Sequence, residues 1–87
     1  MIKRYVKNLR PVQEGDNWRE DVYFVSQPEG AMYWLDAEGA EVKCQELNRG
    51  TRIQSSLGSA YFLTDFKVEK VGWDEYSIYC EDPFLVH

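Results

Sequence analysis

Carboxylates are the only abundant side chains in this sequence that could carry acid–base chemistry. The 87 residues include 15 Asp and Glu but a single histidine, His87. Adjacent carboxylates occur at Glu20-Asp21, Asp74-Glu75 and Glu81-Asp82. Hydrolysis of a glycosidic bond needs two carboxylates that face each other across a cleft, whereas neighbours on a strand point to opposite faces. These pairs are therefore interpreted as solvated surface.

Nucleophilic, metal and phosphate chemistry have equally little support in the sequence. His87 ends the chain, where an imidazole lacks the orienting partner that a catalytic triad needs. Cys44 and Cys80 lack the paired spacing of zinc ligands and are interpreted as small core residues with free thiols. No glycine-rich loop is followed by the lysine of a phosphate-binding motif. We therefore expect a protein that is not an enzyme, with no catalytic residue, cofactor or metal.

Charge and aromatic content favour protein binding. The formal net charge is −5, and 15% of the residues are aromatic. Aromatic anchors inside an acidic rim suit a basic partner. The candidate partner-binding residues form two sequence clusters, which are Tyr33, Trp34, Asp36, Glu38 and Glu41, and Trp73, Asp74 and Glu75. The sequence predicts that these residues bind another protein with a basic surface and inhibit or modulate it.

A second hypothesis is that the protein binds single-stranded nucleic acid. Small β-barrels bind single strands by stacking bases on aromatic rings beside a basic groove. The candidate residues are Arg49, Arg52, Lys67, Lys70 and Tyr61. Because the net negative charge repels a phosphate backbone, nucleic acid is the less favoured partner.

Composition also indicates location and assembly. No apolar run is long enough for a signal peptide or a membrane span, so we expect the protein in the cytoplasm of its own cell or of a host, away from membranes. An exposed aromatic patch would allow a homodimer. No motif identifies a family, although the profile resembles that of small accessory proteins of phages and mobile elements and of toxin-neutralising partners.

The turn residues divide the chain into strand-length runs of a single domain over residues 1–87. We expect a mostly β, antiparallel domain of about five or six strands, as a curved sheet or a small barrel. Consecutive strands should pair as hairpins. The core is expected to contain Val22, Phe24, Tyr33, Leu35, Val42, Phe62, Phe66, Val68, Tyr76 and Ile78.

Two hairpins are predicted within this pattern. The turn Asp36–Gly39 joins strands at 31–35 and 40–45, although 41–48 could instead end as one short helix. The second hairpin pairs 60–71 with 76–80, and the length of its first arm suggests a bend or a bulge. A strand is expected at 21–26 after a loop at 11–17. For residues 1–10 a strand is favoured over a helix, although the apolar spacing also fits a helix.

Overall fold

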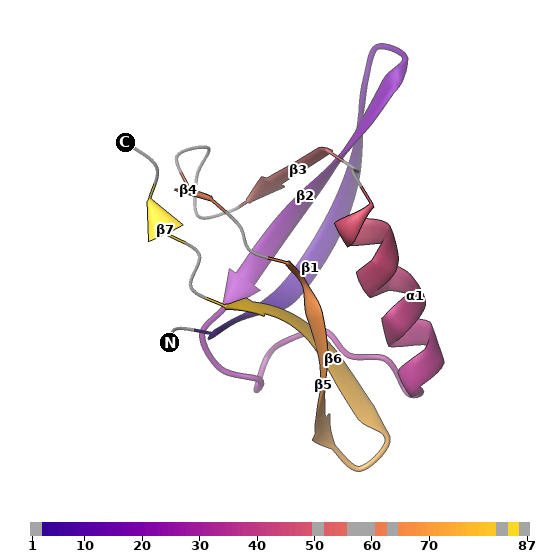
Figure 1. Ribbon diagram of the computed structural model, residues 1–87, viewed down its shortest axis with the longest axis vertical. Coiled ribbons are helices and arrows are strands. Elements are labelled where there is room, and N and C mark those ends of the chain that lie inside the picture. Colours follow the sequence, from indigo (N-terminus) through magenta and orange to yellow (C-terminus); the bar gives the residue numbers. More distant parts are fainter. Residues whose placement is uncertain (1–2, 50–51, 56–60, 63–64, 82–83, 86–87) are drawn as a thin grey trace.

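An open five-stranded sheet packs against one helix (Figure 1). The computed structural model describes residues 3–49, 52–55, 61–62, 65–81 and 84–85, with the backbone alone for 14, 17–19, 52–55, 61–62 and 84–85. The elements are β1 (Lys3–Glu14), β2 (Asn17–Val25), α1 (Ala37–Asn48), β3 (Arg52–Ser55), β4 (Tyr61–Phe62), β5 (Lys67–Gly72), β6 (Glu75–Glu81) and β7 (Phe84–Leu85).

The strand order is β3-β2-β1-β6-β5, and β4 pairs with β7 in a separate two-stranded sheet. Strands β2, β1, β6 and β5 are antiparallel neighbours, which confirms the mostly β, antiparallel prediction. The order ends at β3 and β5 without closure in the described residues, so the curved sheet is right and the barrel is not. Pairing is not purely sequential, because β1 contacts β6 and β3 lies parallel to β2.

Residues 3–10 belong to a strand, as favoured, and residues 1–2 lie outside the described part of the chain. The predicted loop at 11–17 is wrong. Strand β1 continues to Glu14, and Pro11 pairs with Glu20 of β2. A proline is tolerated here because the described pairing of β6 with β1 runs through Lys3–Tyr5, so no described strand lies on that side of β1 at Pro11. The turn is shorter than expected and uses Gly15, whose φ is +61°. The β1–β2 hairpin projects from the body of the molecule (Figure 1).

The predicted first hairpin is wrong, because the segment after Asp36 is helical. Asp36 has an extended backbone, and its Oδ1 accepts a hydrogen bond from the Gly39 N–H at 2.5 Å, which makes it the N-cap of α1. The alternative prediction of one short helix within 41–48 is therefore confirmed, although the helix begins earlier, at Ala37. Its buried face is Ala40, Cys44 and Leu47, a spacing of i, i+4, i+7 that fits a helix.

The core lies between α1 and the sheet. It comprises Val6, Val22, Cys44, Leu47, Phe66, Ile78 and Cys80. Of the predicted core residues, Val22, Phe66 and Ile78 are buried, Phe24 and Val68 pack against the core, and Tyr76 is half-buried. Tyr33, Leu35 and Val42 are exposed, so these three predictions are wrong. The side chain of Phe62 lies outside the described residues.

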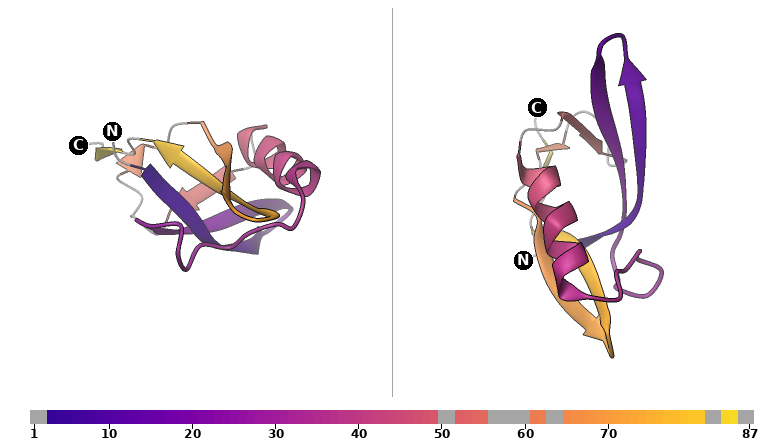
Figure 2. Two further views of the ribbon diagram at one scale, coloured as in Figure 1. Left: turned by 90° about the horizontal axis from the view of Figure 1, so that it is seen from below. Right: turned by 90° about the vertical axis from the view of Figure 1, so that its right-hand side faces the viewer.

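Two polar contacts hold α1 on the sheet. Lys43 Nζ lies 2.9 Å from Oε1 of the buried Glu20 on β2, so the expectation that Glu20 belongs to a solvated pair is wrong. Asn48 at the end of α1 donates through Nδ2 to the Phe66 carbonyl and accepts through Oδ1 from the Phe66 N–H, both at 2.9 Å. These contacts orient the helix along the β5–β6 hairpin (Figure 2).

Candidate protein-binding surface

A single β-bridge brings the two predicted partner-binding clusters together. In the described residues, strand β1 pairs with β6 through Lys3–Tyr5 and then diverges from it. Residues before the helix take its place along β6, where Trp34 and Tyr76 exchange N–H···O bonds of 2.8 and 3.0 Å. Ser77 supports this segment by donating to the Met32 carbonyl at 2.9 Å. Residues 33–36 therefore lie beside the start of β6, next to the β5–β6 turn.

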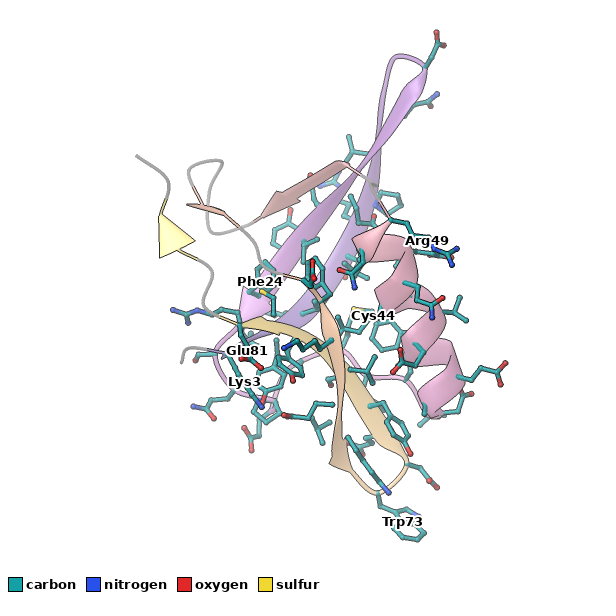
Figure 3. The ribbon with its side chains drawn as sticks, in the orientation of Figure 1. Lys3, Phe24, Cys44, Arg49, Trp73 and Glu81 are labelled. Carbon is teal, nitrogen blue, oxygen red and sulfur yellow. The ribbon has the colours of Figure 1, made fainter. Side chains whose placement is uncertain are left out.

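The β5–β6 turn presents Trp73 at one end of the molecule. Gly72 pairs with Glu75, so Trp73 and Asp74 form the connection, and the register shift between Lys70 and Gly72 matches the predicted bulge. Trp73 is 86% exposed and projects away from the ribbon (Figure 3). Asp74 has a positive φ of 53°, a conformation that aspartate adopts more readily than most residues.

We call this region the bridge-end surface. Its exposed apolar members are Tyr33, Leu35 and Trp73, and its acidic members are Asp36, Glu38, Asp74 and Glu75. Leu35 is 72% exposed and was not among the predicted site residues. Nothing in its local sequence distinguishes it from a core leucine, because only the Trp34–Tyr76 bridge decides which side of the segment faces outward.

Trp34 packs beneath this surface and is not one of its exposed members. It is half-buried and packs against the first turn of α1, where a Cβ added at Gly39 would lie 3.4 Å from Trp34 Cδ1 and 2.9 Å from Asp36 Oδ1. Glycine at this position therefore allows both the N-cap and the tryptophan to approach the helix closely.

The charges around Trp73 are mostly negative. Lys70 is the exception, with Nζ 5.6 Å from the Trp73 ring centroid and 6.0 Å from that of Tyr76, in a cation–π arrangement. Glu41 was predicted with Asp36 and Glu38 at a hairpin tip. All three are exposed, but they lie instead on the first turns of α1. Acids near a helix N-terminus also interact favourably with its dipole, so Asp36 and Glu38 stabilise the helix as well as charging the surface.

The two roles of Asp36 can be separated by substitution. Asp36→Ala removes the oxygen that caps Gly39 and is expected to lower the free energy of unfolding by about 1 kcal/mol. Asp36→Asn keeps a capping oxygen and should change stability by less than about 0.5 kcal/mol, since Asn and Asp are comparable N-caps. Urea denaturation monitored by circular dichroism measures both. Equal losses for the two variants would show that the charge, and not the cap, stabilises α1.

The residues of the nucleic-acid hypothesis are not gathered into one strip in the part of the chain with described side chains. Arg49 follows the last turn of α1, at the end of the helix that lies farther from Trp73 (Figure 3). Lys67 Nζ lies 3.7 Å from Glu81 Oε1, and Lys70 lies over Trp73. The side chains of Arg52 and Tyr61 lie outside the described residues.

A polar cluster joins three strands elsewhere on the sheet. Lys3 Nζ forms an ion pair with Glu69 Oε1, and the Tyr5 hydroxyl donates to Glu69 Oε2 at 2.7 Å. The hydrogen bond from Lys3 lowers the pKa of Glu69, while burial and the same carboxylate raise the pKa of Tyr5. Lys3 also lies over the Tyr79 ring. These contacts join β1 to β5 across β6, so the cluster has a structural role in holding the three strands together.

The cysteines are buried and free, as predicted. Burial raises the pKa of Cys80 to about 11, and burial together with Glu41 raises that of Cys44. At neutral pH both therefore remain protonated thiols of low reactivity. Among the residues that the structure describes, no group of His, Cys, Asp and Glu is arranged to hold a metal ion.

No described helix is both long and apolar enough to cross a lipid bilayer. The sequence matches no family model, and no curated protein or solved structure is significantly similar to it. The bridge-end surface is therefore the feature from which a function can be inferred.

Proposed function

We propose that this protein is a non-enzymatic binding protein whose bridge-end surface engages a basic segment of another protein and inhibits or modulates it by occlusion. The observation that carries the proposal is the Trp34–Tyr76 bridge. It places two acidic and aromatic clusters, far apart in the sequence, at one end of the molecule.

The composition of the surface fits this role. Large exposed apolar side chains, such as Trp73 and Leu35, are costly to leave in water and supply most of the binding energy when a partner covers them. The acids around them steer a basic partner during encounter and exclude acidic ones. Trp73 also offers a ring face to an arginine or lysine of the partner.

The first test uses the full chain as bait in an extract of the cell that produces it, with Trp73→Ala as the matched bait. A partner that acts through this surface should be retained by the wild type. Trp73→Ala should raise the Kd for that partner about thirtyfold, or ~2 kcal/mol, the size of a tryptophan hot spot. Titration calorimetry with the purified partner measures the change. A retained partner with the same affinity for both baits would exclude the bridge-end surface.

The second test isolates charge. Asp74→Asn/Glu75→Gln should slow association with that partner about tenfold at low salt and far less at high salt, because the acids act through long-range attraction. Asp16→Asn/Asp65→Asn removes the same charge from exposed sites elsewhere and serves as the matched control. Equal effects of the two pairs in stopped-flow measurements would mean that only net charge matters.

A further inference from the structure

The outer edge of β5 carries backbone groups that β6 does not use. Strand β5 is the last strand of its sheet, and the structure describes no strand on its other side. An edge strand presents unpaired backbone N–H and C=O groups that can pair with another strand. The hydrogen-bonding pattern of the neighbouring strands shows which residues of β5 present those groups.

The register gives Val68 and Lys70 as the outward-facing positions. Tyr76 uses its N–H and C=O for Trp34, on the side of β6 away from β5. Because the direction of these groups alternates along an antiparallel strand, Glu69–Ser77 and Lys67–Tyr79 are the hydrogen-bonded pairs of β5 with β6. Val68 and Lys70 therefore point their backbone groups away from β6.

The open part of this edge is limited at both ends. Phe66 faces outward as well, but Asn48 already bonds its N–H and C=O. At the other end, the bulge between Lys70 and Gly72 interrupts the regular backbone. The available edge is thus centred on Glu69, with one outward-facing residue on each side. The hairpin tip also projects beyond the first turn of α1 (Figure 2).

We propose that β5 pairs antiparallel with β5 of a second copy of this chain, about a two-fold axis at Glu69. Such an axis sets Val68 opposite Lys70 of the other copy, and Lys70 opposite its Val68. All four outward backbone groups of each copy are then used, in a closed, self-complementary interface. A register centred on Val68 would instead set Lys70 against Phe66, whose groups Asn48 occupies.

The side chains are compatible with this pairing. Val68 would lie beside the aliphatic stem of Lys70 from the other copy, and Lys67 beside Val71. The two Glu69 side chains would face each other, which is unfavourable for bare charges. Each Glu69 carboxylate is already bonded to Lys3 and Tyr5, however, so its charge is largely compensated.

A matched pair of variants at Lys70 tests the proposal in the full chain. Lys70→Pro removes an outward-facing N–H that β6 does not use, whereas Lys70→Ala loses the same side chain but keeps that N–H. In sedimentation equilibrium from micromolar to millimolar concentration, wild type and Lys70→Ala should dimerise. Lys70→Pro should raise the dimer Kd at least about tenfold, as expected for lost interstrand hydrogen bonds.

Amide hydrogen exchange of the wild type gives a readout that does not require the proline variant to fold. The backbone amides of Val68 and Lys70 should exchange more slowly as protein concentration rises, while the exchange rate of the Asp16 amide stays unchanged. A monomer at millimolar concentration, or a dimer in which Val68 and Lys70 exchange as fast as in the monomer, would overturn the proposal. Trp73→Ala should still dimerise, so failure at this edge and failure of the bridge-end surface are distinguishable.

Discussion

Replacing Lys43 with methionine is expected to lower the free energy of unfolding by about 3 kcal/mol, because it leaves a buried carboxylate without its cation. Glu20 is only 6% exposed, and its Oε2 has no hydrogen-bond partner among the described residues, so Lys43 is the group that compensates its charge. Methionine keeps the helix propensity and the apolar stem of lysine. The loss should therefore come from the charge alone, and chemical denaturation at pH 7 measures it.

Two further variants make this result specific. Glu20→Met/Lys43→Met removes both charges and should recover most of the lost stability, since replacing a buried ion pair by apolar groups is often neutral or stabilising. Glu46→Gln alters the other carboxylate near Lys43, which is 3.4 Å away with a largely exposed side chain. It should cost less than about 0.5 kcal/mol. A Lys43→Met loss no larger than that of Glu46→Gln would show that Glu20 does not need its partner.

Ile78→Ala is expected to cost about 3 kcal/mol, whereas Val42→Ala should change stability by less than about 0.5 kcal/mol. Both residues are predicted core positions from their local sequence. In the structure Ile78 on β6 is fully buried in the main cluster, so its truncation leaves a cavity. Val42 is 54% exposed on α1, where alanine also has the higher helix propensity.

Thermal denaturation of these two variants checks the orientation of α1 directly. A strand at 40–45 with Val42 facing inward would make the two truncations similarly costly. A large loss for Val42→Ala would therefore contradict the helix, while a small loss for Ile78→Ala would contradict the packing of β6 beneath it.

Strands with a clear local signal could be predicted from sequence. The β5–β6 hairpin is recognisable because alternating residues flank a tight connection. The predicted first arm over 60–71 is too long, because β5 begins at Lys67 and Tyr61–Phe62 pair with β7. The bulge before Gly72 therefore exists, but not for the reason that the length of the arm suggested. The apolar spacing of residues 1–10 is compatible with a helix as well as with a strand. The long pairing of β1 with β2, through nine register partners from Tyr5 to Glu14, decides for the strand.

The segment from Asp36 to Asn48 shows where local reasoning fails. Asp36 followed by Gly39 suits a turn, but an aspartate that caps an N–H three residues later also begins a helix. The residues that follow favour helix, and Ala40, Cys44 and Leu47 give it a buried face. Strand-like alternation around Val42 competes with these signals and predicts Val42 in the core, whereas the helix leaves it exposed.

The sequence indicates the residue types of the candidate surface but not its geometry. Its residue types and its two clusters follow from composition, because aromatic and acidic side chains are visible in any sequence. The two clusters come together because the segment before α1 runs beside β6. It does so beyond the point where β1 separates from β6. Leu35 joins the site for the same reason. Among the basic residues of the nucleic-acid hypothesis whose side chains the structure describes, Arg49, Lys67 and Lys70 do not form one strip.

The β-rich fold class and the acidic, aromatic character of the surface follow from the sequence, since alternation, turn residues and charge are local properties. Which residues share a surface, which strand ends the described sheet and which acid is buried depend on the folded chain. Those outcomes depend on pairings such as Trp34 with Tyr76 and Glu20 with Lys43. Partners of this kind are far apart in the chain, and they meet only because folding buries one common core.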